Sequence, residues 1–217
     1  MKRAFIATII AVLFVHMVSA QTVVLLETFE GTFPQNNGWT VGGNATWAKV
    51  TNGFGNHVAA SGNAFAYCAA IGNAGTPQNP VYPSSMNGYM GRAIDLTGNA
   101  TATLSFWYMI PSIEECFHIF GRCDYFSVQI DGQEIYFDEN PSLSWMPVSI
   151  NLRPYGMTNH VVSFQFVSNG SFNHEGAYLD HIVILGQKTL LPNVLVNNPN
   201  ADATSRNTQS EPSIVLG

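Results

Sequence analysis

Charged residues are scarce in this chain. Lysine, arginine, aspartate and glutamate make up 10% of its 217 residues, with 14 acidic residues against 8 basic ones. The basic residues form no cluster anywhere in the sequence. A protein that binds a nucleic-acid backbone neutralises the phosphates with grouped lysines and arginines. The composition therefore excludes nucleic acid as a partner.

The sequence also lacks an apolar run long enough to cross a bilayer. Its longest run, residues 4–15, is shorter than the roughly 20 residues that a transmembrane helix needs. Lys2 and Arg3 precede this run, and the small residues at 18–20 offer a cleavage site after it. This order is typical of a secretory signal peptide. We therefore expect residues 1–20 to be removed on export, and the remaining chain to be secreted, extracellular or at the cell surface, and not membrane-spanning.

Cysteine is rare as well: Cys68, Cys116 and Cys123 are the only three. Their spacings lack the paired C-x-x-C signature of a zinc site. In an oxidising compartment the short loop between Cys116 and Cys123 favours a disulfide between them. The alternative pairing joins Cys68 to one of these two and leaves the other free.

No segment shows a sustained helical period, whereas alternation of apolar and polar residues recurs along the chain. It is clearest in residues 101–110 and 125–130, and a period of two indicates strands with one buried face. Asp131-Gly132 separates two such segments and is a hairpin signal. This pattern predicts an all-β fold, a two-sheet antiparallel jelly-roll β-sandwich. The expected strands are 23–29, 39–41, 45–50, 64–69, 89–96, 101–110, 125–130, 130–135, 146–152, 162–166 and 177–185.

The strand patterns end before the last part of the chain. Residues 21–188 are long enough for one sandwich domain with a sizeable core. Residues 189–217 are instead rich in Asn, Ser, Thr, Pro and Ala and have no periodicity. That composition predicts a flexible linker or disordered tail.

Five sequence blocks occur in a fixed order over residues 24–185: Glu27 to Pro34 followed by Gly38-Trp39, Met86 to Met90 with Ile94 to Gly98, Ala102 to Tyr108, Cys123 to Phe126, and Glu175 to Asp180. Together they resemble the MAM-like jelly rolls, which include cleaved-adhesin and choice-of-anchor domains and the C-terminal domains of immune-inhibitor-A-like metallopeptidases. The resemblance implies a jelly-roll fold and a role in adhesion. One departure is His181, where these domains usually carry the second acid of Asp-Asp-Ile.

A structural calcium ion is the metal that the sequence favours. Calcium takes several oxygen ligands, and an ionised Asp180 within an apolar strand is costly unless it is paired or ligated. Similar domains bind calcium at the edge formed by the first and last strands, which implies Glu30, Asp124 and Asp180 as ligands. Asn63, in a turn, offers a further oxygen. The alternative is that Asp180 accepts hydrogen bonds from the protein and no metal binds.

The sequence contains no convincing catalytic constellation. His174-Glu175 and His181 suggest a zinc-peptidase motif, but the histidines are too far apart and Gly176 begins a strand-like run. No Gly-x-Ser-x-Gly elbow follows a strand, and the acidic pairs adjoin one another on loops instead of facing across a cleft. We therefore predict no catalytic residues and no enzymatic activity.

The function expected from these observations is secreted, non-catalytic adhesion or recognition, as an accessory domain that contacts an extracellular protein or glycan surface. One alternative is a carbohydrate-binding module, because exposed aromatic rings stack on sugars. Another is a non-catalytic fragment of a secreted hydrolase or peptidase. Part of the aromatic set must fill the core of a sandwich. The candidate aromatic residues are Trp39, Trp47, Tyr82, Tyr89, Trp107 and Trp145.

Overall fold

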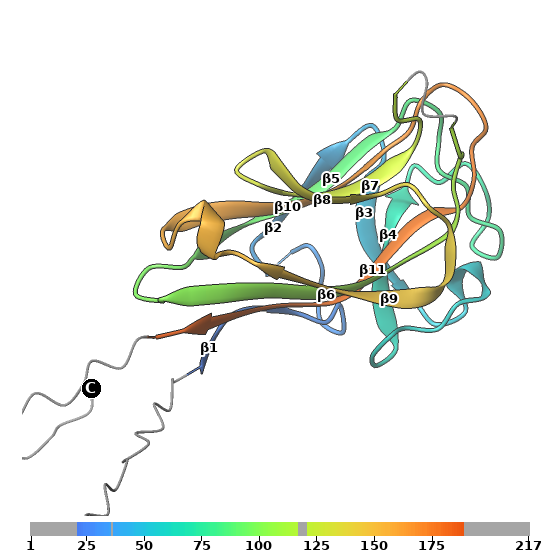
Figure 1. The fold of residues 1–217 in the computed structure, drawn as a ribbon. Coiled ribbons are helices and arrows are strands. Elements are labelled where there is room, and N and C mark those ends of the chain that lie inside the picture. Colours follow the sequence, from blue (N-terminus) through green and yellow to red (C-terminus); the bar gives the residue numbers. More distant parts are fainter. Residues whose placement is uncertain (1–20, 36, 117–120, 189–217) are drawn as a thin grey trace, which may run out of the picture.

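The structure is a computed structural model that describes residues 21–35, 37–116 and 121–188 (Figure 1). The predicted signal peptide and the predicted tail lie outside these residues. No helix in the described ranges is long and apolar enough to cross a membrane. The strands are β1 (Gln21–Glu27), β2 (Trp39–Gly43), β3 (Thr46–Thr51), β4 (Ala64–Ile71), β5 (Asn87–Asp95), β6 (Thr101–Ser112), β7 (Tyr125–Ile130), β8 (Gln133–Asp138), β9 (Ser142–Asn151), β10 (Asn159–Val167) and β11 (Gly176–Gln187).

The strands form two antiparallel sheets that face each other (Figure 1). One sheet has the order β3-β4-β11-β6-β9, and β1 also pairs with β11. The other has the order β2-β5-β10-β7-β8. β4 pairs with the start of β11, at Tyr178 and Leu179, whereas β1 pairs with its later part, from Ile182 to Gln187. The predicted all-β, two-sheet jelly-roll sandwich is confirmed.

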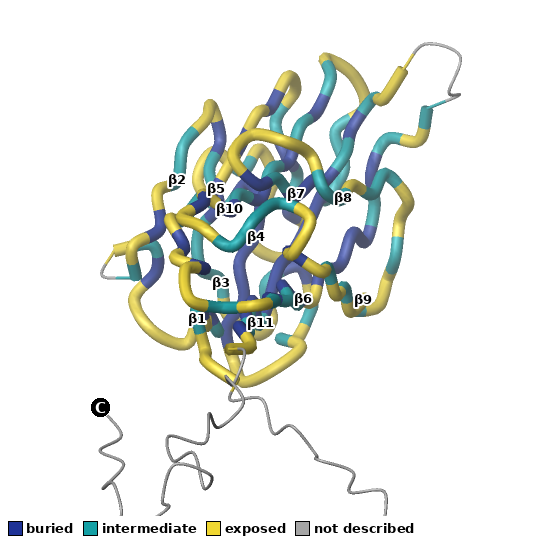
Figure 2. The backbone as a smooth tube through the Cα atoms, turned by 60° about the vertical axis from the view of Figure 1, so that its left-hand side comes forward, coloured by how far each residue is buried: buried dark blue, intermediate teal, exposed yellow. Residues whose placement is uncertain are grey.

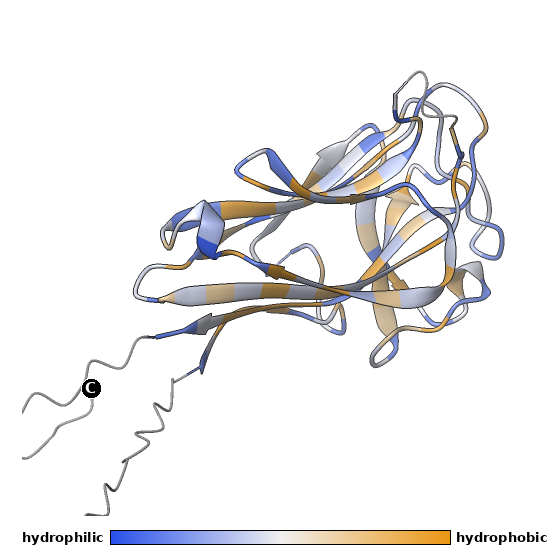
Figure 3. Cartoon of the chain, in the orientation of Figure 1, coloured by the Kyte–Doolittle hydropathy of each residue, from blue (hydrophilic) through white to orange (hydrophobic). Residues whose placement is uncertain are grey.

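Alternating side chains from both sheets fill the core. Leu104, Phe106 and Tyr108 of β6 point inward and are buried, as their spacing predicts. The ring of Phe106 lies 5.3 Å from that of Phe164 and 6.2 Å from that of Phe126, so rings from the two sheets interdigitate. Figure 2 shows the resulting run of buried residues between the sheets, and Figure 3 shows hydrophobic and hydrophilic residues alternating along the strands.

Strand β9 is longer than the sequence predicts. It begins at Ser142, four residues before the expected start at Met146. β9 is an edge strand, and Leu143 is 80% exposed. A strand whose side chains are not buried on one face does not produce a period-two pattern in the sequence. The sequence therefore does not predict residues 142–145 as part of this strand.

Two short 3-10 turns complete the described fold. The first, η1 (Phe54–Asn56), lies in the loop between β3 and β4, and η3 (Arg153–Tyr155) joins β9 to β10. His57, just after η1, approaches Glu175 at the start of β11, with 2.6 Å between Nε2 and Oε1. The β3–β4 loop, which carries the predicted calcium ligand Asn63, is therefore held against β11, which carries Asp180.

Candidate functional site

The β3–β4 loop encloses the carboxylate of Glu30, which follows β1. Glu30 Oε1 accepts hydrogen bonds from the peptide N–H groups of Asn63 (2.7 Å) and Ala64 (2.9 Å). Gly62 has a φ of +72°, and a Cβ at this position would collide with the same carboxylate oxygen. The two N–H donors, Asn63 first, hold the pKa of Glu30 below its ordinary value. These two hydrogen bonds therefore favour the ionised form of Glu30.

Asp180 of β11 approaches the same loop from the other side. Its side chain is fully buried, and Oδ2 accepts a hydrogen bond from the Ser61 N–H (2.9 Å). Oδ1 accepts one from the N–H of His181 (2.7 Å), which has a φ of +48° where the pairing of β11 with β6 shifts register. Burial raises the pKa of Asp180, and the N–H donors counteract this. Asp180 and Glu30 therefore both bind peptide N–H groups of residues 61–64.

A basic side chain that the sequence analysis missed lies beside this loop. Lys49 of β3 donates hydrogen bonds from Nζ to the carbonyl oxygens of Glu30 (2.8 Å) and Gly31 (3.0 Å). The positive charge of Lys49 also lowers the pKa of the Glu30 carboxyl. Nothing in the local sequence indicates this contact, because it depends on how β3 pairs with β4 and where the chain runs after β1.

Three of the four predicted calcium ligands thus meet at one loop. Glu30 and Asp180 contribute carboxylates, and the amide oxygen of Asn63 lies 3.3 Å from Asn52 Nδ2, which donates to it. Two carboxylates, an amide oxygen and nearby carbonyls are the donors that a hard cation takes, so these residues fit calcium chemically. Lys49 already places one positive charge beside Glu30.

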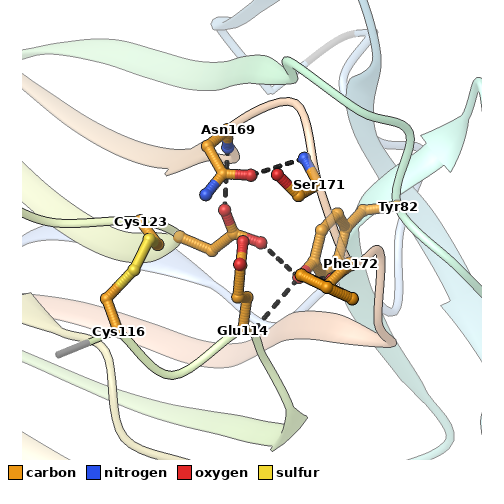
Figure 4. The surroundings of a disulfide bond; sticks show 8 residues. Tyr82, Glu114, Cys116, Cys123, Asn169, Ser171 and Phe172 are labelled. Carbon is orange, nitrogen blue, oxygen red and sulfur yellow. Dashed lines mark hydrogen bonds between the residues drawn. A yellow bond between two sulfur atoms is a disulfide. The ribbon is translucent and has the colours of Figure 1, made fainter.

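The fourth predicted ligand, Asp124, lies before β7 and has different partners (Figure 4). The Tyr82 hydroxyl donates to Oδ2, and the Asn169 N–H donates to Oδ1 at 2.8 Å. Within the described ranges, no hydrogen bond joins Asp124 to the other three ligands. Burial raises the pKa of Asp124, and the negative charge of Glu114 adds to this.

A disulfide lies next to Asp124. It joins Cys116 to Cys123, whose Cα atoms are 5.7 Å apart, and Cys68 is a free, buried thiol in β4. The pairing that the short loop favours is therefore present. A carboxylate oxygen of Glu114 lies within 4.8 Å of both sulfur atoms. Because these sulfurs are bonded to each other, they are not available as thiolate ligands.

The residues of the apparent zinc-peptidase motif do not converge on one another. Glu175 accepts a hydrogen bond from the Tyr178 hydroxyl (2.6 Å) and lies 2.6 Å from His57 Nε2. β11 begins at Gly176, so Glu175 precedes the strand and His181 lies within it, and the two do not share one face of a helix. Burial raises the pKa of the Tyr178 hydroxyl, and the hydrogen bond to Glu175 raises it further. This cluster ties the β3–β4 loop to β11.

The fold buries some of the six candidate aromatic residues and leaves others exposed. Trp39, Trp47 and Tyr82 are buried in the core. Trp145 is half-buried and donates from Nε1 to the carbonyl of Val58 (2.8 Å). Two rings remain on opposite outer faces of the sandwich: Tyr89 on β5 is 38% exposed, and Trp107 on β6 is 37% exposed.

A shallow groove of about 470 Å³ lies beside Tyr89 on the outer face of the five-stranded sheet. The Tyr89 ring lies across Gly42 of β2, because a Cβ at Gly42 would collide with that ring. Arg92 also lines the groove, with its guanidinium 6.0 Å from the centre of the Trp39 ring. No carboxylate pairs with Arg92 in the described part of the chain. Because Arg92 is paired with the buried residues Trp39 and Val162, its side chain leaves β5 on the face opposite to Tyr89. The groove thus offers the Tyr89 ring to solvent.

Neither a protein-family model nor a curated protein matches this chain. Among solved structures, the K1 cleaved-adhesin domain of Lys-gingipain from Porphyromonas gingivalis is 15% identical, covers 76% of this chain and 97% of its own, and has a TM-score of 0.49. The carbohydrate-binding module TmCBM61, in complex with β-1,4-galactotriose, is 14% identical, covers 72% of this chain and 92% of its own, and scores 0.47.

A xylan-binding domain of carbohydrate-binding family 22 is also similar in fold. It is 17% identical, covers 78% of this chain and 97% of its own, and has a TM-score of 0.46. The fold is therefore similar to those of cleaved-adhesin domains and carbohydrate-binding modules. The closer resemblance to MAM-like and immune-inhibitor-A-like domains stays a prediction.

Proposed function

We propose that this chain is a secreted, non-catalytic recognition domain that binds an extracellular protein or glycan surface through the outer face of its five-stranded sheet. The observation that carries the proposal is the groove beside Tyr89. There an aromatic ring faces solvent on a rigid sheet, beside the polar side chains of Thr40 and Ser163. Sites that bind ligands combine apolar or aromatic surface with a few polar groups in this way.

The buried acids of the described chain support a structural role over a catalytic one. Glu27, Asp124 and Asp180 each accept hydrogen bonds from N–H groups or a tyrosine hydroxyl of their own domain. General acid–base chemistry needs titratable groups that converge where a substrate can enter. The groove beside Tyr89 has no carboxylate among its lining residues.

Binding of the exported chain, residues 21–217, to cells and to extracellular matrix tests the proposal. We expect binding that Tyr89→Ala weakens and that Trp107→Ala, a matched ring on the opposite face, leaves unchanged. Turnover of casein or polysaccharide by the same preparation would favour the hydrolase alternative. Equal binding by the wild type and both variants would exclude this face.

The proposal includes a structural calcium ion at the loop between Glu30 and Asp180. Glu30, Asn63 and Asp180 would hold the ion, and the cation would offset the charge of two carboxylates brought close together. Its role would be to fix the β3–β4 loop to the ends of β1 and β11. Asp124 is not in this ligand set, because its hydrogen bonds run to Tyr82 and Asn169.

Calorimetric titration of EDTA-treated protein with calcium tests the metal. We expect binding heat and a higher melting temperature, because a ligand that binds only the folded state stabilises it. Asp124→Asn is the matched control and should keep the calcium response, whereas Asp180→Asn should lose it. Absence of both heat and a melting shift in the wild type would contradict the calcium proposal and leave the recognition proposal standing.

A further inference from the structure

The outer face of the five-stranded sheet carries a single row of side chains that runs across the strands. Tyr89 of β5 is paired directly with Gln165 of β10, Gln165 with Ser127 of β7, and Ser127 with Phe137 of β8. Residues opposite each other on paired strands project from the same face. The neighbours of these four along each strand are core residues such as Phe166 and Phe126, so the row faces outward.

The two ends of the row are alike. Tyr89 is 38% exposed and Phe137 is 43% exposed. At the Phe137 end, the guanidinium of Arg122 lies 3.6 Å from the centre of the ring and is held in turn by Glu134 at 2.7 Å. The row therefore has an exposed ring at both ends and a planar donor at one.

The middle of the row is polar and preorganised. Gln129 donates from Nε2 to the Gln165 carbonyl oxygen at 2.6 Å, which fixes both amides and leaves the Gln165 NH₂ group available as a donor. The Ser127 hydroxyl is buried and has no hydrogen-bond partner among the described residues. Gly91, opposite Ser163, adds no side chain to the β5 side. The floor between the rings is thus low, and the half-buried amides of Gln165 and Gln129 are its accessible polar groups.

These features match one class of ligand. β5 and β8 are three strand spacings apart, about 14 Å, which an extended chain of about three sugar rings spans. Sugars present apolar C–H faces that stack on aromatic rings and hydroxyl edges that pair with amides and guanidinium groups. A protein partner would need a larger apolar centre than two separated rings provide.

We infer that this row binds a linear glycan that lies across the strands, with one sugar ring at Tyr89 and another at Phe137. The inference rests on the proposed recognition function and specifies its ligand. Gln165 and Gln129 would contact the sugar between the two rings.

Titration with defined oligosaccharides tests the inference. The probes are xylohexaose, cellohexaose, β-1,4-galactohexaose and hexagalacturonate, with the corresponding disaccharides, followed by calorimetry or by NMR shifts. We expect at least one hexasaccharide to bind, and Tyr89→Ala or Gln165→Ala to weaken it about tenfold or more. Trp107→Ala, with an equally exposed ring on the other sheet, should bind like the wild type.

The length of the oligosaccharide distinguishes a site that extends along the whole row from a pocket for a single sugar. Phe137→Ala should weaken the hexasaccharide while leaving the disaccharide affinity unchanged, because a disaccharide at Tyr89 does not reach β8. Unchanged melting temperatures would show that each variant folds. The inference is overturned if no hexasaccharide binds, or if Tyr89→Ala and Gln165→Ala bind normally. Binding to cells that depends on Tyr89 without any glycan binding would overturn it and keep the proposed function.

Discussion

Two aspartates in this domain are equally buried but held by different kinds of donor. Asp180 and Asp124 are both fully buried, and burial raises the pKa of each. Asp180 accepts from two peptide N–H groups, whereas Asp124 accepts from one N–H and from the Tyr82 hydroxyl. A peptide N–H only donates, but a hydroxyl both donates and accepts. Both carboxylate oxygens of Asp180 must therefore act as hydrogen-bond acceptors. At Asp124 only Oδ1, which faces the Asn169 N–H, must do so.

The charged groups around the two aspartates also differ. The β3–β4 loop that binds Asp180 also binds Glu30, whose main-chain carbonyl accepts from the Lys49 ammonium. Asp124 has a second acid, Glu114, and an uncharged disulfide beside it, and Glu114 raises its pKa whereas His174 lowers it. A lysine therefore takes part in the hydrogen bonds around the Asp180 loop but not in those of Asp124.

The largest effect expected is that of Asp180→Asn. One amide oxygen replaces two acceptors, so the new NH₂ group faces a peptide N–H that cannot accept. Losing a charge-assisted hydrogen bond and leaving a buried donor unpaired should reduce the free energy of unfolding by about 3 kcal/mol. Urea denaturation measures this. A loss no larger than that of Asp124→Asn would show that the two sites do not differ as proposed.

The next largest effect is expected from the disulfide at the Asp124 end. The double variant Cys116→Ser/Cys123→Ser opens a short loop, and chain entropy puts the loss at about 2 kcal/mol. Wild-type protein treated with a reductant is the matched control and should lose the same amount. If reduction leaves the melting temperature unchanged, the loop is held by its other contacts and the disulfide adds no stability.

Lys49→Met tests the cation at the Asp180 end. It removes two charge-assisted hydrogen bonds at a partly exposed site, and we expect a loss of about 1 kcal/mol. Because the loop then carries more uncompensated negative charge, calcium should raise the melting temperature of this variant more than that of the wild type. Arg153→Met, a cation outside the loop, is the control. An equal calcium response in both variants would contradict the proposed ion.

Asp124→Asn should have the smallest effect at neutral pH, less than about 1 kcal/mol, because the Tyr82 hydroxyl can reverse and accept from the new amide. The effect of this variant is best recognised from how the free energy of unfolding depends on pH. The folded-state pKa of Asp124 lies above its ordinary value of 3.8, so its contribution to stability is present below that value and is lost as the pH rises through the raised pKa.

Urea midpoints measured from pH 3 to pH 8 test this. Wild-type stability should fall more steeply than that of Asp124→Asn on the alkaline side of pH 3.8. Asp95→Asn, an exposed acid whose hydrogen bonds to Thr97 lower its pKa, should change the curve in the opposite sense. Identical curves for the wild type and Asp124→Asn would contradict the raised pKa.

The sequence predicts the sandwich well because its signal is local. Alternation at Leu104, Phe106 and Tyr108 is produced by burial of one strand face, and the structure confirms that these side chains fill the core. The exposed start of β9 was missed because edge positions such as Leu143 impose no such pattern.

Three of the four predicted calcium ligands lie at one loop and Asp124 does not. Whether two ligands lie together depends on the sheet to which each belongs. Asp180 lies in β11 of the six-stranded sheet, and Asp124 precedes β7 of the five-stranded sheet. Order along the chain does not specify this assignment. For the same reason, neither Lys49 nor the row from Tyr89 to Phe137 could be found before the strand registers were known.

The pairing of β1 with β11 has a mechanical consequence. Gln21 lies opposite Gln187, so the first and last strands are antiparallel and the chain enters and leaves the sandwich at the same point (Figure 1). A force that pulls these two points apart would break the β1–β11 hydrogen bonds one after another, starting at Gln21 and Gln187, and not all at once. Under tension from both ends, β1 would peel away first, while the five-stranded sheet with its outward row would stay folded.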